Sequence, residues 1–123
     1  MSRNLTVRLQ DDRPGAFSAV AEALGAAGVN IEGVMEMEGV VHVLVPDGAV
    51  ARRALESAGL QIEAEADPVV VKLEDRPGEL AGVTKRLANA GVDLRVVYLA
   101  TGTRVVFVVS DPDRAREEIG QTS

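Results

Sequence analysis

The alternation of apolar and polar residues predicts short strands separated by amphipathic helices. Residues 5–9 alternate between the two types, which is typical of a strand with one buried face. Apolar residues then recur at helical spacing over 17–24, so a helix is predicted there. Three further strands are predicted over 29–37, 40–45 and 60–64. A helix around Met35 stays an alternative to the first of these three strands.

Proline, glycine and aspartate mark where the helices begin and end. Pro14 is expected in the first turn of the first helix, where its missing N–H group costs nothing. Gly28 is expected to stop that helix, because glycine adopts the left-handed conformation without strain. Asp47 is predicted to cap a second helix, which ends near Gly59. The first half of the chain therefore has the predicted order βαββαβ.

An internal repeat then organises the whole chain. The tetrapeptide Asp-Arg-Pro-Gly at 12–15 returns at 75–78. The segment Ala-Gly-Val-Asn-Ile at 27–31 returns as Ala-Gly-Val-Asp-Leu at 90–94, with the same offset in residue number. Two motifs at one offset, with matching apolar positions between them, indicate a duplicated unit.

The offset between the two copies changes at two places. The first strands, over 5–9 and 69–73, are offset by one position more than the motifs, so the first loop of the first copy carries one additional acidic residue. The larger offset returns after the glycine turns at Gly39 and Gly102, so an insertion of one residue is expected near those turns.

The repeat predicts the domain organisation and the fold class. The modules are expected over 1–66 and 67–123, joined at Asp67-Pro68, and the second module lacks the last strand. The predicted fold is α+β: two ferredoxin-like βαββαβ modules, the second without its last strand, with antiparallel sheets and helices on one face. A lone module of this size buries only about 60% of its unfolded surface, which favours pairing of the modules.

The second module is apolar on both faces of its predicted sheet. Val105, Phe107 and Val109 point one way along the third strand, while Val106 and Val108 point the other way. Helices on a single face cannot bury both sets. The missing strand also leaves an edge on which pairing is favoured. We therefore expect a covering partner, most simply a second copy of the chain in a homodimer.

Composition narrows the classes of partner. Thirteen Lys and Arg against nineteen Asp and Glu give a net charge of −6, whereas a nucleic-acid surface is usually basic. The three aromatic residues provide no array for stacking bases. Neither a signal peptide nor a stretch of the roughly 20 apolar residues needed to span a membrane is found. No nucleic acid and no membrane is expected as partner, and the expected location is cytoplasmic.

Catalysis and metal binding are not expected either. The chain has no cysteine, no G-x-S-x-G motif and no P-loop, and no carboxylate pair stands in an acid–base pattern. His42 is the only histidine and is interpreted as a strand-face residue. Glu36 and Glu38 are interpreted as part of a solvated face. The chain is therefore predicted to be no enzyme and to need no metal or other cofactor.

The motifs resemble those of a known family. In each copy a strand is followed by Asp-Arg-Pro-Gly opening a helix, and Gly-Val-Asn-Ile or Gly-Val-Asp-Leu then starts the next strand. This arrangement is similar to that of the ACT domain, and the similarity covers nearly the whole chain twice. ACT domains are small amino-acid-binding regulatory modules attached to enzymes of amino-acid metabolism, and they also occur as free-standing tandem proteins. The resemblance thus implies a small amino acid as ligand and such an enzyme as a possible partner.

The loop that precedes each first helix has the groups that an amino acid needs. Backbone N–H groups at a helix N-terminus are unpaired and carry partial positive charge. A ligand carboxylate is therefore favoured near 15–17 and near 78–80, where Gly15 and Gly78 allow close approach. The nearby aspartates can accept hydrogen bonds from a ligand ammonium group.

The resemblance also implies which residues act together. In paired ACT units the loop of one unit faces the start of the second strand of the other. One site would then combine 10–17 with Asp93, and another would combine 74–80 with Asn30. Asp93 stands where the family has Asn, and its charge beside that of Asp12 would repel an anionic ligand. The second site is therefore preferred.

We therefore expect a regulatory module that binds a small amino acid at the junction of its two units and transmits occupancy to a partner. The alternative is a ligand-free scaffold that uses the same fold for assembly. The residues expected to contact a ligand are Gln10, Asp11, Asp12, Gly15, Ala16, Phe17, Asn30, Ile31, Asp75, Arg76, Pro77, Gly78, Glu79, Leu80, Asp93 and Leu94.

Overall fold

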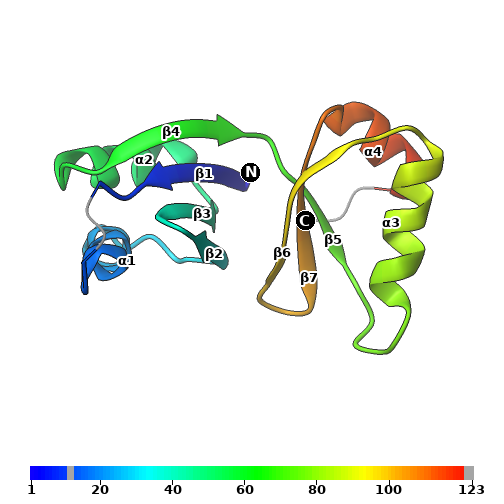
Figure 1. The fold of residues 1–123 in the computed structure, drawn as a ribbon, viewed down its shortest axis with the longest axis horizontal. Helices are drawn as coiled ribbons and strands as arrows, with labels where there is room; N and C mark the ends of the chain where they lie inside the picture. The colour runs from blue at the N-terminus through cyan, green and yellow to red at the C-terminus, as the bar shows by residue number, and fades with distance from the viewer. Residues whose placement is uncertain (11–12, 121–123) are drawn as a thin grey trace. The chain divides into compact units, whose positions relative to one another are not determined.

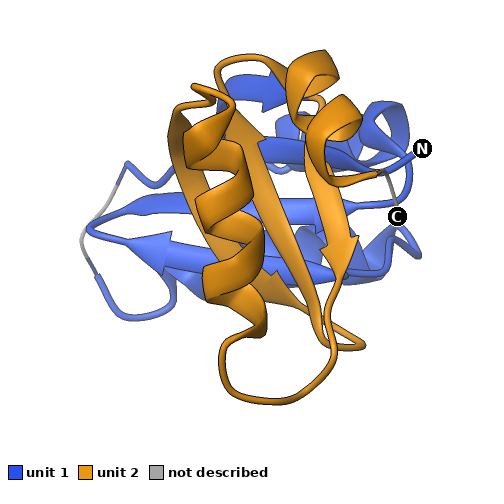
Figure 2. Cartoon of the chain, turned by 90° about the vertical axis from the view of Figure 1, so that its right-hand side faces the viewer, with its two compact units in different colours: residues 1–66 blue, residues 67–123 orange. Residues whose placement is uncertain are grey.

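The chain forms two compact α+β units in the predicted order of elements, βαββαβ and then βαββα (Figure 1). The structure, a computed structural model, describes residues 1–10 and 13–120. Unit 1 comprises residues 1–66 and unit 2 comprises residues 67–123 (Figure 2). Each unit has its own apolar core, so each is described by itself below.

Unit 1 is a four-stranded antiparallel sheet with two helices. Its elements are β1 (Arg3–Arg8), α1 (Ala16–Ala26), β2 (Gly33–Met37), β3 (Val40–Val45), α2 (Gly48–Ser57) and β4 (Gln61–Ala66). The strand order is β4-β1-β3-β2, and each neighbouring pair is antiparallel. Both helices pack on one face of the sheet, because the same core contains residues of α1, α2, β1 and β3.

The alternation in the sequence explains this one-sided packing. Leu5 and Val7 of β1 are fully buried, and they pair in register with Val43 and Val41 of β3. Leu24 of α1 is also fully buried in this cluster. Burying a Leu or Val side chain stabilises a fold by about 1.5–3 kcal/mol, so this face holds unit 1 together.

Unit 2 repeats the arrangement with one strand fewer. Its elements are β5 (Val69–Lys72), α3 (Glu79–Asn89), β6 (Leu94–Ala100), β7 (Arg104–Val109) and α4 (Pro112–Ile119). The strand order is β6-β7-β5, with antiparallel pairs, so β5 ends the sheet of this unit as expected from the missing strand. Figure 2 shows α3 and α4 together on one face of that sheet. The core beneath them includes Leu87, Phe107 and Ala115.

The helix ends confirm the predicted stop and cap residues. Gly28 has a φ of 73° and donates its N–H to the Gly25 carbonyl, while the Val29 N–H bonds the Leu24 carbonyl. These two bonds form the Schellman motif that glycine permits at the end of a helix. The Asp47 carboxylate accepts the N–H groups of Ala49 and Val50 at 3.0 and 3.2 Å, which makes it the N-cap of α2.

Two predicted boundaries are wrong. Pro14 is not in the first turn of α1, because the helix begins at Ala16 after Gly15, whose φ of 94° only glycine adopts easily. The second strand of unit 1 begins at Gly33 rather than Val29. Val29 and Ile31 pack against the core, but they lie before the first residue of β2.

The expected insertion near the glycine turns is confirmed. In unit 1 only Glu38 and Gly39 separate β2 from β3, and both have positive φ, as in a type I′ hairpin turn. In unit 2 the longer segment 101–103 separates β6 from β7. This longer turn accounts for the change of offset between the two copies.

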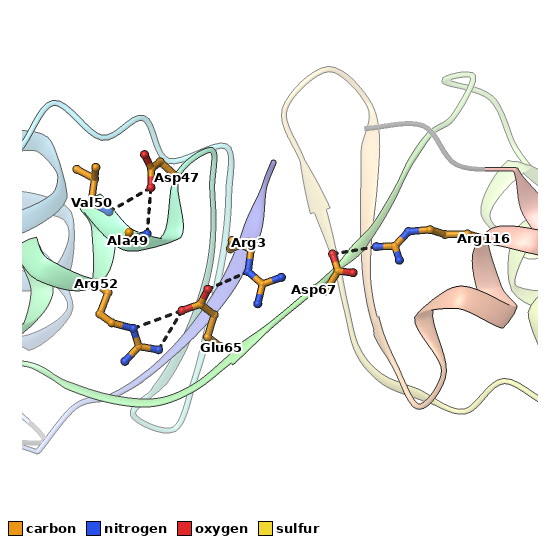
Figure 3. A network of polar contacts seen from close by, with 8 residues as sticks. All are labelled: Arg3, Asp47, Ala49, Val50, Arg52, Glu65, Asp67 and Arg116. Atoms are coloured by element: carbon orange, nitrogen blue, oxygen red, sulfur yellow. Dashed lines mark hydrogen bonds and ion pairs between the residues drawn. The ribbon is translucent and has the colours of Figure 1, made fainter.

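Within unit 1, ion pairs link the end of β4 to β1 and α2 (Figure 3). The Glu65 carboxylate accepts the Arg3 Nε–H at 2.8 Å and an Arg52 guanidinium N–H at 3.0 Å. These hydrogen bonds lower the pKa of Glu65 below its ordinary value. At the start of unit 2, Asp67 pairs with Arg116 at 2.9 Å. The residues on either side of Ala66 are thus each held within their own unit.

Candidate functional site

The first helix of each unit begins at a glycine N-cap. Gly15 and Gly78 occupy the N-cap positions of α1 and α3, with φ of 94° and 89°, and as glycines they supply no capping side chain. The other two helices are capped by Asp47 and Asp111. The starts of α1 and α3 therefore resemble one another and differ from the starts of α2 and α4.

The amide groups of the unit 1 loop are partly engaged within the loop. The Ala16 N–H donates to the Arg13 carbonyl at 3.2 Å. This amide is therefore not available to a ligand, contrary to the expectation from the sequence. The Ala19 N–H donates to the Gly15 carbonyl, which is the ordinary helical bond. Any carboxylate at this helix start would therefore depend on the Arg13 side chain as well as on backbone amides.

A hollow of about 490 Å³ borders this loop in unit 1. It lies within the size range of about 300–1,000 Å³ that small-molecule sites occupy. Its walls come from the end of β1, the loop before α1, the first turn of α1 and the β2–β3 hairpin. The lining residues are Leu9, Gln10, Arg13, Ala16, Phe17, Glu36, Glu38 and Gly39.

The hairpin reaches the loop because of the sheet register. The Leu9 N–H donates to the Gly39 carbonyl at 2.7 Å, which fixes the β2–β3 turn beside the end of β1. The Gly39 N–H in turn donates to Glu36 Oε2 at 2.9 Å. Backbone pairing therefore brings two carboxylates of the hairpin to the wall of the hollow, opposite in charge to Arg13.

The lining combines both signs of charge with apolar surface. Arg13 carries a positive charge, and Glu36 and Glu38 carry negative charges. Leu9 and Phe17 supply the apolar part, and Phe17 is 40% exposed. A charged ligand with two opposite ends and a small side chain would find a partner for each part in such a lining.

A smaller hollow of about 210 Å³ borders the same loop. It shares Leu9, Gln10, Arg13 and Ala16 with the larger one and is otherwise lined by Arg8, Ala19 and residues 58–61. Gln10 Nε2 donates to Gln61 Oε1 at 2.8 Å, which ties the loop to β4. Its volume is below the usual range for a small-molecule site, so the larger hollow is the candidate.

The corresponding loop of unit 2 contains an ion pair. Arg76 Nε donates to Glu79 Oε2 at 2.9 Å, and this bond lowers the pKa of Glu79 below its ordinary value. Asp75, Pro77 and Gly78 are exposed in the same loop. Leu80, in the first turn of α3, is 41% exposed. This loop thus presents the residues that the sequence analysis names, with a carboxylate of the chain itself on its arginine.

The predicted second-strand residues lie elsewhere in each unit. Asn30 is exposed and Ile31 half-buried in the segment before β2, and neither lines the hollow. In unit 2 the Asp93 N–H donates to Ser110 Oγ at 3.1 Å, and Leu94 packs against the core. Each is described in its own unit only, so the predicted pairing across units stays a prediction.

Asp11 and Asp12, also predicted to contact a ligand, lie outside the described residues. Four lining residues of the hollow lie outside the predicted segment 10–17: Leu9, Glu36, Glu38 and Gly39. Arg13 lies within that segment, although only its counterpart Arg76 is named individually. Glu36 and Glu38 are exposed, as predicted, but the sequence carries no signal that the register brings them to the loop.

Comparisons with solved structures identify the fold. A protein of Bacteroides thetaiotaomicron is 23% identical, with a TM-score of 0.74 over 96% of this chain and 84% of that chain. The ligand-free regulatory subunit of aspartate kinase from Thermus thermophilus is 18% identical, with a TM-score of 0.71 over 96% and 87%. The regulatory subunit from Thermus flavus is 17% identical, with a TM-score of 0.66 over 95% and 89%.

The chain has the ACT-domain fold. These structural similarities, at low sequence identity, establish the fold and do not identify a ligand. No family model matches the chain, and a comparison with curated proteins found no match. Within the described ranges, no helix has the length and apolar character needed to cross a membrane. Residues 1–10 and 13–120 also contain no group of three or more His, Cys, Asp or Glu side chains placed to hold a metal ion.

Proposed function

We propose that this ACT-fold chain is a non-catalytic regulatory module that binds a small amino acid in the hollow beside the unit 1 loop. The observation that carries the proposal is the lining: Arg13 for a carboxylate, Glu36 and Glu38 for an ammonium group, and Leu9 and Phe17 for a side chain. A free amino acid presents these three chemical features together. The regulatory subunits of aspartate kinase with the same fold support the regulatory part of the proposal.

The ligand would act by shifting a population of conformations. It would contact the first turn of α1 on one side and the β2–β3 hairpin on the other. A ligand that holds both elements stabilises the conformation in which they are closed around it. A partner enzyme that touches either element would then respond to occupancy. We propose an enzyme of amino-acid metabolism as that partner.

Calorimetric titration with each proteinogenic amino acid tests the proposal, with Arg13→Ala as the decisive variant. A hydrogen bond between charged groups contributes about 1.5–3 kcal/mol, so losing it weakens binding by about ten- to a hundredfold. Arg53→Ala is the matched control, because Arg53 is exposed on α2 and does not line the hollow. The proposal fails if no amino acid gives heat at millimolar concentration, or if both variants bind equally well.

A second candidate function is assembly without a ligand. Val97 and Leu99 of β6 are 38% and 65% exposed, and Met37 of β2 is 65% exposed. Exposed apolar strand residues of this kind favour association, including the homodimer that the sequence predicts. Sedimentation equilibrium separates the two functions: assembly alone predicts an oligomer whose mass is the same with and without amino acids, and whose association weakens in Leu99→Lys.

A further inference from the structure

The wall that the β2–β3 hairpin gives to the larger hollow carries two carboxylates. Glu36 pairs with Val41 of β3, which belongs to the core beneath the helices, so Glu36 is on the face of the sheet that carries α1. Glu38 is in the turn of the hairpin, with a φ of 50°. Both residues are exposed and line the hollow. Strand register and turn thus place two negative charges on one wall.

The two carboxylates are not matched by a cation within the described part of the chain. Glu36 Oε2 accepts the Gly39 N–H at 2.9 Å, which holds this carboxylate in place without neutralising it. Over residues 1–10 and 13–120, neither Glu36 nor Glu38 forms an ion pair. Even with the full charge of Arg13, the lining has two negative charges against one positive charge. The hollow therefore has an excess of negative charge.

The apolar part of the lining suits a hydrocarbon chain that ends in a cation. Leu9 and Phe17 line the same hollow, and Phe17 is 40% exposed. The hydrocarbon stem of a long cationic side chain packs on apolar surface while its charged end contacts polar groups. The face of an aromatic ring also attracts a cation. Both features favour a long cationic side chain over a neutral one.

We propose that the hollow selects an amino acid with a cationic side chain, such as lysine. This inference rests on the proposed function and names the class of amino acid. Glu36, held by the Gly39 amide, takes the α-ammonium group, whose position is set by the carboxylate next to it. Glu38 takes the side-chain cation and thereby determines specificity. A neutral amino acid leaves one carboxylate without a partner, and an acidic one adds a further negative charge.

The acidic wall is not repeated in unit 2. At the equivalent positions of the second copy, Leu99 stands in place of Glu36 and Thr101 in place of Glu38. Leu99 is 65% exposed, so this position of unit 2 presents an apolar side chain instead of a carboxylate. The selection of a cationic side chain is therefore assigned to the unit 1 loop.

Calorimetric titration with three matched probes tests the inference. Lysine is compared with norleucine, which lacks the side-chain ammonium group, and with cadaverine, which lacks the carboxylate. The wild type is expected to bind lysine about ten- to a hundredfold more tightly than norleucine, which cannot form the charged hydrogen bond to Glu38. Glu38→Gln is expected to remove this preference and to leave the affinity for norleucine unchanged. Glu22→Gln, an exposed change on α1 outside the lining, is the control and keeps the preference.

The outcomes separate this inference from the proposed function. If lysine and norleucine bind the wild type equally well, or if the preference persists in Glu38→Gln, the inference is overturned while the proposed function stands. If cadaverine binds as tightly as lysine and Glu38→Gln weakens both, the recognition of a cation is upheld and the amino-acid ligand of the proposed function is refuted. If neither lysine nor norleucine gives heat at millimolar concentration, the inference is overturned, and titration with the other amino acids decides the proposed function.

Discussion

Gly48 lies where one added carbon atom would collide with the ion pair of unit 1. A Cβ atom at this first residue of α2 would lie 2.9 Å from Arg3 Cγ, 2.9 Å from Glu65 Oε2 and 3.2 Å from Arg3 Cβ. Optimal contacts between carbon atoms are about 3.5–4.0 Å long. Gly48→Ala therefore forces the Arg3 and Glu65 side chains apart and lengthens their 2.8 Å bond.

The magnitude follows from opposing effects. Overpacking of this kind destabilises a fold by about 1–3 kcal/mol. Replacing glycine by alanine in a helix stabilises it by about 0.5–1 kcal/mol. The ion pair is partly exposed, so its loss adds little more. We expect a net loss of about 1 kcal/mol, which lowers the Tm of a unit of this size by about 4–8 °C.

Gly25→Ala in α1 is the matched control. An added Cβ at Gly25 has no neighbour within 4 Å, so this variant is expected to gain about 0.5–1 kcal/mol. Urea unfolding of both variants, followed by circular dichroism, measures the difference. The reasoning is refuted if Gly48→Ala is as stable as the wild type, or gains stability as Gly25→Ala does.

Two further predictions concern stability. Asp47→Ala and Asp111→Ala each remove a carboxylate that caps a helix, and each is expected to lower the free energy of unfolding by about 1 kcal/mol. Asp47→Asn is expected to keep most of the stability, and equal losses in Asp47→Asn and Asp47→Ala would contradict the capping role. Burial lowers the pKa of His42 below 6.5, against a smaller opposite effect of Glu63, so the folded state binds its proton less tightly than the unfolded chain does. The contribution of neutral His42 to the free energy of unfolding is therefore fully present above about pH 6.5, and it is lost as the pH falls toward and through the lowered pKa. Urea midpoints measured across this range should fall less in His42→Gln, and an identical pH dependence in that variant would contradict the account.

The fold could be predicted from the sequence because local patterns and the fold agree. The third strand of unit 1, over 40–45, is found at the predicted residues, since its β-branched residues and a preceding glycine turn both mark it. The boundary at Val29 could not be predicted, because an apolar residue that packs on the core without joining the ladder looks like a strand residue.

The candidate site was predictable only in part. The repeat led to the loops that begin at Gln10 and Glu74, and the exposed helix starts follow from their glycines. The hairpin wall of the hollow depends on the bond between Leu9 and Gly39, which is a consequence of strand register.

Backbone amide NMR during titration with single amino acids tests the central claim most directly, because it locates the ligand. For a bound amino acid, we predict the largest shifts at Phe17 and Gly39, on the two walls of the hollow, and little change at Leu80 and Ala81 at the start of α3. Shifts confined to α3, or an unchanged spectrum with every amino acid, would contradict the assignment of the unit 1 loop as the binding site.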